Sequence, residues 1–227
     1  MIKIDRGFLL SKFKYNENSV IADFYTENNG RSSSIIFGGT SKKIKGYLQI
    51  GNLFHLNFSS KNNGKVSSIK PEIIKAFTPV YFNSQKKLHC ITSAMSLIKK
   101  LTPENENNKN IFNLIQNLFY ILENNNWLKM YINWELELLK FLGYDLNLKN
   151  MVHKENINNK TVYYVKSSTQ KKIVPSFLIN NDIENIDNVE LLKGITLVTS
   201  FMEKNIFTPN NMKIPYQRKL FENSLIN

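Results

Sequence analysis

The side chains in this sequence that are best suited to chemistry are positively charged. Lys42, Lys43 and Lys45 follow a Gly-Gly bend at 38–39, and Arg31 follows a hairpin signal. Two further candidates end the first predicted strand: Lys12 and Lys14. Ammonium and guanidinium groups bind phosphate oxygens, so we predict that these six residues contact a nucleic-acid backbone.

The surrounding composition supports this prediction. The run from 28 to 71 holds seven basic residues and no acidic residue, and residues 1–80 carry a net charge of +7 (12 basic, 5 acidic). The whole chain is also basic, with a formal charge of +12 and a pI near 9.6. A plainer alternative stays open, in which the lysines form a solvated face or reflect an Asn-, Lys- and Ile-rich composition.

Aromatic residues near the lysines are a second candidate feature. Those that stand close in sequence are Tyr15, Tyr25, Phe37, Tyr47 and Phe54. Exposed rings stack on bases, but most of these residues fit the core of a sheet better.

Catalytic and metal-binding patterns are weak. The chain has no glycine-rich phosphate loop of the common types, and His55, His89 and His153 are widely spaced. Its single cysteine, Cys90, excludes a four-cysteine zinc site and fits a buried apolar position. Glu135 and Glu137 are two residues apart on a predicted helix and so do not share a face. We therefore expect no catalytic residue, no metal site and no cofactor.

The positively charged side chains are carried by a segment with β-type patterning. Alternating apolar residues and intervening glycines predict five short strands that close into a small barrel, with the lysines at 42–45 in a loop. The predicted strands are 7–14, 19–26, 32–37, 53–58 and 65–69.

Helical periodicity begins near Pro79. The predicted helices are 86–100, 111–122, 127–142, 189–206 and 215–225, with a helix start at Thr102-Pro103. Residues 144–188 are polar, with a strand signal at 161–165. The expected fold class is α+β, with a barrel domain at 1–79 and an α-helical domain at 80–227.

We expect neither a signal peptide at the N-terminus nor a membrane-spanning stretch. Lys12 and Lys14 follow Leu10 too soon for a signal peptide, and no apolar stretch is long enough to span a membrane. We expect a cytoplasmic, nucleoid-associated protein.

Three segments, in this order, resemble the bacterial RecO family. They read GFLLS…NSVIADFYTENNGRSSSIIFGGTSKK…LQIGN, then WELELLKFLGYDLNL, then LLKGITLVTSFMEKNIF…NNMKIPYQRKLF. The resemblance implies an oligonucleotide/oligosaccharide-binding (OB) barrel followed by a helical domain. It also implies a DNA-repair and recombination mediator, active in the response to DNA damage. Such a protein binds single- and double-stranded DNA, anneals strands, engages RecR and single-strand-binding protein, and helps load RecA.

The sequence departs from the family's pattern at two points. Many members hold a four-cysteine zinc module after the Leu-Gly-Tyr motif, whereas 144–188 contains no cysteine here. We therefore expect a cysteine-free, zinc-finger-like segment without metal. LQI also replaces the family's frequent LQP, which loosens a turn.

Three hypotheses follow. The leading one is a non-enzymatic DNA-binding recombination mediator. The second is an RNA- or ribosome-associated OB-fold protein, since barrels of this type bind either polymer. The third, a hydrolase or transferase, has no side-chain cluster to support it.

Overall fold

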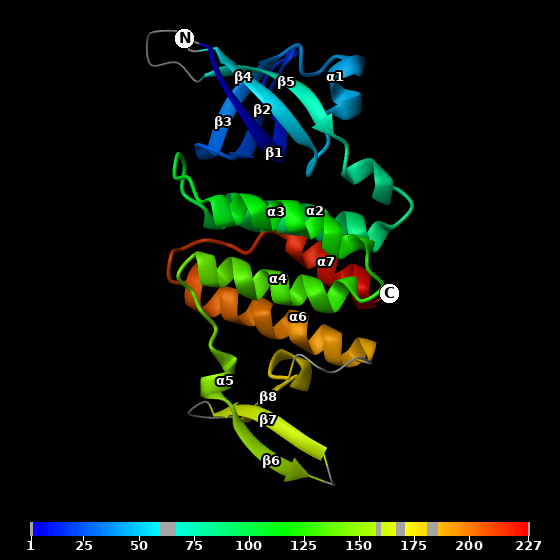
Figure 1. Cartoon of the computed structure of the whole chain (residues 1–227), viewed down its shortest axis with the longest axis vertical. Helices are drawn as coiled ribbons and strands as arrows, with labels where there is room; N and C mark the ends of the chain where they lie inside the picture. Colours follow the sequence, from blue (N-terminus) through cyan, green and yellow to red (C-terminus); the bar gives the residue numbers. More distant parts are fainter. Residues whose placement is uncertain (1, 60–66, 158–159, 167–170, 181–185, 227) are drawn as a thin grey trace. The chain divides into compact units, whose positions relative to one another are not determined.

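The computed structural model describes residues 2–59, 67–157, 160–166, 171–180 and 186–226 (Figure 1). The chain forms two compact units. Unit 1 comprises Met1–Phe119, Pro215–Leu225 and Asn227, and unit 2 comprises Tyr120–Ile214 and Ile226. These units are defined by compactness, whereas the boundary predicted at residue 79 separates the barrel domain from the helical domain. That domain boundary stays a prediction.

Five strands of unit 1 close into a barrel in the order β1-β2-β3-β5-β4, and β1 pairs with both β2 and β4. All pairs are antiparallel except β3 with β5, which are parallel. This is the order of an OB barrel, so the predicted barrel is confirmed. The strands are β1 (Ile2–Lys14), β2 (Ser19–Thr26), β3 (Gly30–Phe37), β4 (Leu53–Ser59) and β5 (Ser68–Lys75).

Two strands, β1 and β5, differ from their predicted bounds by more than two residues. β1 begins at Ile2 instead of residue 7, because its first half pairs with β4, which is distant in sequence. β5 extends to Lys75, beyond the predicted end at 69, and residues 65–66 of the prediction lie outside the described residues. Pro71 is tolerated inside β5 because that strand meets β3 at a single pair, Ile35 with Ser68.

Alternation along β1 separates two apolar clusters. Leu9 points into the barrel, where it packs with residues of the other strands. Phe8 points to the opposite face and lies 5.2 Å from Phe112, measured between ring centroids. Phe77 and Phe119 stack at 4.2 Å beside them. The barrel core consists of Leu9, Val20, Ala22, Phe24, Ile36, Leu48, Phe54, Leu56 and Ile69.

The segment predicted as a lysine loop is a short helix, α1 (Lys42–Tyr47), so this prediction was wrong. Gly38 adopts a positive φ of +69° and turns the chain after β3. The hydroxyl oxygen of Ser41 then accepts a hydrogen bond from the Ile44 amide and caps the helix. The helix was missed because its sequence shows only a capping serine and two apolar residues, Ile44 and Tyr47. A pattern this short cannot be distinguished from a polar loop.

The remaining helices of unit 1 follow β5. They are the 3₁₀ turn η1 (Thr78–Tyr81), α2 (Gln85–Leu101), α3 (Lys109–Glu123), whose last turn enters unit 2, and α7 (Tyr216–Ile226), whose last residue also belongs to unit 2. The predicted helix start at Thr102-Pro103 was wrong. Thr102 caps the C-terminus of α2, and α3 begins only at Lys109. Cys90 is fully buried in α2, as predicted.

Unit 2 combines helices with a three-stranded sheet. The helical elements are α4 (Trp127–Phe141), α5 (Leu148–Met151), the 3₁₀ turn η2 (Ser176–Leu178), α6 (Asn188–Met202) and the π-helical turn η3 (Glu203–Phe207). The antiparallel sheet has the order β6-β7-β8, with β6 (His153–Ile157), β7 (Lys160–Lys166) and β8 (Lys171–Val174). The sequence predicted only the middle strand.

Candidate nucleic-acid interface

The two sides of helix α1 differ in character. Ile44 and Tyr47 are three residues apart, so they lie on one side, and both pack against the barrel core. Lys42, Lys43 and Lys45 are exposed. Within the described part of the chain, no carboxylate forms an ion pair with any of these three ammonium groups. The barrel core therefore orients the helix, and the helix presents three unneutralised charges to solvent.

Lys12 ties strand β1 to the end of this helix. Its ammonium group donates a hydrogen bond to the carbonyl oxygen of Leu48, the residue that caps α1. Burial lowers the pKa of Lys12, and the positive charge of Lys45 lowers it further. Lys12 is thus a neighbour of the lysine helix, but its side chain is already engaged in positioning it.

Lys14 lies at the same end of the barrel as α1. It ends β1 opposite Val20, and the start of β2 is paired with the end of β3, from which the chain continues into α1. A hydrogen bond of 2.8 Å from the Thr40 hydroxyl to the Glu17 carbonyl joins the two turns. The structure therefore gathers five of the six predicted residues around α1: Lys12, Lys14, Lys42, Lys43 and Lys45.

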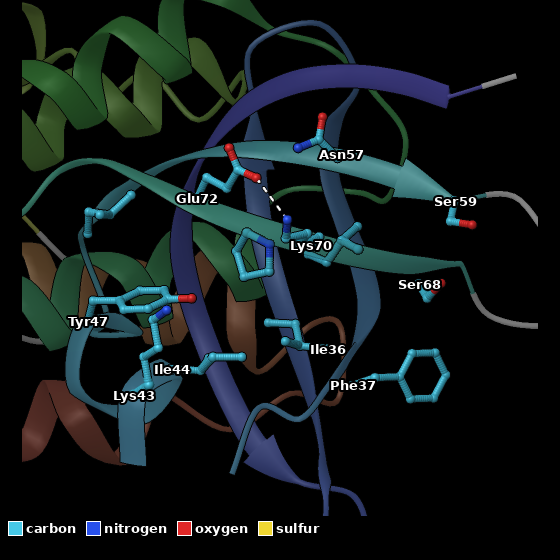
Figure 2. A pocket seen from close by; sticks show the side chains of 13 residues that line it. Ile36, Phe37, Lys43, Ile44, Tyr47, Asn57, Ser59, Ser68, Lys70 and Glu72 are labelled. Carbon is cyan, nitrogen blue, oxygen red and sulfur yellow. Dashed lines mark ion pairs between the residues drawn. The ribbon is translucent and has the colours of Figure 1, made fainter. Parts of the chain in front are cut away.

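A cavity of about 710 Å³ opens beside α1 (Figure 2). Figure 2 shows Lys43, Ile44 and Tyr47 of α1 on one side and Lys70 and Glu72 of β5 on the other. The remaining lining residues come from β3, β4 and β5: Ile36, Phe37, Asn57, Ser59, Ser68, Ile69, Pro71 and Ile73. Its wall combines apolar side chains with Lys43 and with Lys70, whose ammonium group lies 3.3 Å from the Glu72 carboxylate. An apolar wall with a lysine at its edge suits a flat apolar group attached to an anion.

The barrel topology explains why the cavity is there. β3 and β5 share one parallel pair, Ile35 with Ser68. Among the described residues, the edge of β3 that faces β5 has no further pairing beyond Ile35, although its other edge stays paired with β2. Pro71 has no amide hydrogen to offer in this region. Helix α1 lies over the resulting gap and fills it only in part, with Ile44 and Tyr47.

Arg31 lies at the other end of β3 from α1. Its guanidinium group contacts the Glu104 carboxylate at 2.9 Å and donates a second hydrogen bond of 2.9 Å to the Thr102 carbonyl. Its side chain is only 17% exposed. The structure therefore separates Arg31 from the lysine helix and gives it a role in holding the β2–β3 hairpin. A direct contact between Arg31 and a nucleic-acid strand stays a prediction.

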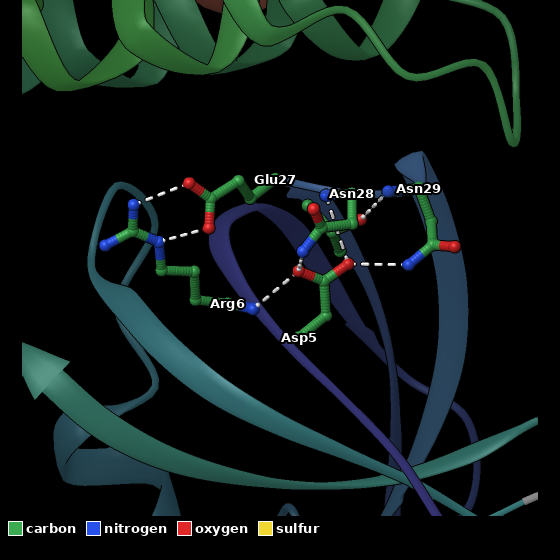
Figure 3. Close-up of polar contacts among 6 residues, drawn as sticks. Asp5, Arg6, Glu27, Asn28 and Asn29 are labelled. Atoms are coloured by element: carbon green, nitrogen blue, oxygen red, sulfur yellow. Dashed lines mark hydrogen bonds and ion pairs between the residues drawn. The ribbon is translucent and has the colours of Figure 1, made fainter.

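The same hairpin is fixed by a second polar network (Figure 3). The buried Asp5 carboxylate accepts hydrogen bonds from the side-chain amides of Asn28 (2.9 Å) and Asn29 (2.6 Å). Arg6 forms a two-pronged ion pair with Glu27, at 2.5 and 2.6 Å. Arg6 and Arg31, the two arginines at this end of the barrel, are thus each paired with a carboxylate, in contrast to the lysines of α1.

The aromatic candidates divide between surface and core. Tyr25 and Phe54 are fully buried, as the alternative interpretation held, whereas Phe37 is 64% exposed and Tyr15 is 58% exposed. Phe37 and Tyr47 both line the cavity. Sequence reasoning missed the contribution of Lys70, Asn57 and Pro71, because only the pairing of β4 with β5 brings them next to α1.

The described residues contain neither a metal-binding cluster nor a membrane-spanning helix. Among the described residues, no group of three or more His, Cys, Asp or Glu side chains is placed to hold a metal ion. In the same part of the chain, no helix has both the length and the apolar character to cross a bilayer.

A closed five-stranded barrel in this order, with basic residues beside an open cavity, defines the class of OB-fold binding proteins. Comparison with protein families narrows the class. The model described as "Recombination protein O N terminal" matches residues 1–77, and the model described as "Recombination protein O C terminal" matches residues 84–207. The chain belongs to the RecO family.

Curated relatives agree over nearly the whole chain. The proteins named DNA repair protein RecO from Rickettsia akari and Rickettsia canadensis are each 29% identical to it. The match with the Rickettsia akari protein covers 98% of this chain and 98% of that protein. The match with the Rickettsia canadensis protein covers 91% of this chain and 90% of that protein. The protein of the same name from Rhodospirillum centenum is 22% identical over 96% of this chain and 92% of its own. Among solved structures, Entamoeba histolytica asparaginyl-tRNA synthetase aligns with 94% of this chain and 59% of its own at 10% identity, and the TM-score of 0.28 carries no structural conclusion.

Proposed function

We propose that this protein is a DNA-binding mediator of DNA repair and recombination, and that a strand binds along helix α1 and the cavity beside it. The observation that carries the proposal is the group of three exposed lysines on α1, none of which forms an ion pair with any residue that the structure describes. The names of the curated relatives support the DNA-repair context. Lys42 and Lys45 would contact successive phosphates, and Lys43 would lie where a base enters the cavity.

The site would accept both single and double strands through the phosphate backbone. Phosphate contacts are independent of sequence, which suits a protein that must act at any damaged position. The cavity adds a preference for single strands, because only an unpaired base can leave the stack and meet Phe37 or Tyr47.

A salt titration of oligonucleotide binding tests the proposal. Each phosphate contact contributes a slope of about −0.7 for single strands, so Lys42→Ala/Lys43→Ala/Lys45→Ala should make the slope shallower by about 2. The matched control is Lys86→Ala/Lys100→Ala/Lys219→Ala, three exposed lysines of unit 1 outside the barrel. Equal slopes for the wild type and the α1 variant would remove this helix from the interface.

The choice between DNA and RNA needs a separate measurement. Competition between DNA and RNA oligomers of matched sequence distinguishes the repair function from an RNA- or ribosome-associated one. We expect DNA to compete at least as well as RNA. Strong preference for RNA, abolished by the α1 variant, would reassign the same interface to the second hypothesis.

We further propose that the barrel at 1–79 carries the strand contacts and that residues 80–227 contact partner proteins. The partners implied by the family resemblance are RecR, single-strand-binding protein and, indirectly, RecA. An annealing assay with complementary strands coated by single-strand-binding protein tests this directly. The wild type should accelerate annealing and the α1 variant should not, whereas the lysine control should behave as the wild type.

A further inference from the structure

Helix α1 is too short to be stable through its own hydrogen bonds. It comprises six residues, Lys42–Tyr47, whereas isolated helices of fewer than about 12 residues are marginal in water. None of its residues is buried, and its two apolar side chains, Ile44 and Tyr47, pack only in part against the barrel core. The position of α1 on the barrel therefore depends strongly on how its ends are held.

The C-terminal end of α1 is held by polar side chains. A helix end leaves its last carbonyl groups without partners inside the helix. Three side chains, those of Lys12, Gln49 and Asn52, donate hydrogen bonds to the carbonyl oxygens of residues 45–48. The last turn of α1 is thus stabilised by groups that lie outside the helix.

Asn52 differs from the other two because it joins α1 to an element further along the chain. Its side-chain nitrogen donates to the Tyr47 carbonyl at 3.0 Å, and its side-chain oxygen accepts from the Thr78 amide of η1, also at 3.0 Å. Its backbone carbonyl accepts a hydrogen bond of 3.1 Å from the Leu9 amide of β1. The residue is fully buried. One side chain therefore connects the end of α1 with the start of η1.

The segment that carries Asn52 is closely packed against η1 and α2. A Cβ atom at Gly51 would lie 2.8 Å from the Thr78 hydroxyl oxygen and 2.9 Å from the Ile91 side chain of α2. The Thr78 hydroxyl donates a hydrogen bond of 2.5 Å to the Ile50 carbonyl. Asn52 thus holds α1 from a part of the barrel that is itself fixed.

We infer that Asn52 is the positioning residue of helix α1, an inference that rests on the strand-binding function proposed above. By holding the Tyr47 carbonyl, Asn52 fixes the part of the cavity wall that Tyr47 forms and the direction in which the lysines of α1 point. Asn52 is buried and carries no charge, so it acts through α1 and not by contact with a strand.

Hydrogen–deuterium exchange of the full chain without DNA tests the link itself. Asn52→Ala removes both side-chain hydrogen bonds, so the Lys45 and Leu48 amides should exchange about three- to tenfold faster than in the wild type. Asn52→Asp provides a second variant in case the alanine variant does not fold. It keeps the size of the side chain and the acceptor for the Thr78 amide, and it loses the donor to Tyr47. The same two amides should exchange faster in it.

The matched control is Thr102→Val, which removes a buried hydrogen bond of 2.7 Å between the Thr102 hydroxyl and the Ile98 carbonyl of α2. This control should leave the exchange of the Lys45 and Leu48 amides unchanged, because it does not touch α1. Wild-type exchange of these amides in a folded Asn52 variant would overturn the inference. Equal acceleration in Thr102→Val would overturn it as well.

A salt series of oligo(dT) binding tests the consequence for the interface. Asn52→Ala removes no charge, yet the slope should become shallower by about 0.7 to 1.4, the contribution of one or two displaced phosphate contacts. Thr102→Val should keep the wild-type slope, because a change in stability alone moves no lysine. A wild-type slope for Asn52→Ala would overturn the positioning role if Lys42→Ala/Lys43→Ala/Lys45→Ala does change the slope. A wild-type slope for that lysine variant would contradict the proposed function, whereas the exchange measurement without DNA still decides whether Asn52 holds α1.

Discussion

The Lys99 ammonium group of α2 lies 2.5 Å from the Asp23 carboxylate of β2 and thereby fastens the first long helix to the barrel wall. Asp23 is 5% exposed at its side chain and also accepts hydrogen bonds from the hydroxyls of Ser11 and Ser33. Lys99 donates in turn to the Ser11 hydroxyl at 2.8 Å. Four polar groups therefore satisfy one another where β1, β2, β3 and α2 meet.

The first prediction follows from the cost of leaving a buried charge without its partner. Lys99→Met should lower the free energy of unfolding by about 2–3 kcal/mol, which urea denaturation would measure. The adjacent and exposed Lys100 provides the control, since Lys100→Met should change stability by no more than about 0.5 kcal/mol. Equal effects of the two substitutions would show that the ion pair does not fasten the helix.

The second prediction concerns pH. Burial raises the pKa of Asp23, but the hydrogen bonds from Lys99, Ser11 and Ser33 together outweigh it, and the net pKa lies below its ordinary value. The stabilisation by this carboxylate is therefore fully present above its unfolded pKa of about 3.9 and is lost as the pH falls through the folded value. Unfolding free energies of wild type and Asp23→Asn, measured from about pH 6 down to pH 2, should begin to converge only as the pH falls below about 4. A difference that stays constant over this range would contradict the assignment.

The third prediction concerns two glycines with opposite surroundings. A Cβ atom at Gly30, where φ is +67°, would lie 1.8 Å from the Glu106 carbonyl oxygen, so Gly30→Ala should cost about 2–4 kcal/mol. Nothing lies within 4 Å of a Cβ atom at Gly46 in α1, and Gly46→Ala should stabilise the protein by about 0.5–1 kcal/mol. Thermal unfolding of both variants measures the contrast. A stable Gly30→Ala protein would mean that the hairpin does not approach the 104–107 segment.

The fourth prediction separates stacking from charge at the barrel site. Phe37 is 64% exposed, so Phe37→Ala should leave stability nearly unchanged while weakening single-strand binding about tenfold. The salt slope should stay at the wild-type value, because no phosphate contact is removed. Duplex binding is the internal control and should be affected less. Equal losses for single and double strands would exclude base stacking at Phe37.

Some features of the fold were predictable because they are local. Alternating apolar residues located β2 within its observed bounds, and helical periodicity located α2 and α4 to within about one residue. Gly143 follows α4 with a positive φ of +82°, a conformation that glycine adopts readily at the end of a helix. These patterns depend on neighbours a few residues away, which the sequence displays directly.

The features that were missed depend on distant partners. The pairing of β1 with β4 adds the first half of β1, and the pairing of β4 with β5 brings Lys70 to the cavity. Arg31 was grouped with the lysines by its sequence proximity, whereas Glu104, 73 residues away, engages it. β6 and β8 are short and mostly polar, and they pair with β7, whose Tyr163 is buried beside Val174 at the end of β8. Without that pairing their sequences give no strand signal.

Hydrogen–deuterium exchange of the full chain, with and without saturating oligo(dT), tests the barrel interface most directly. We predict slower exchange in Lys42–Tyr47 and in the β5 residues that face the cavity, with α6 unchanged as the internal reference. Unchanged exchange throughout α1 under saturating oligonucleotide would contradict the assignment of this helix and its cavity as the place where a strand binds.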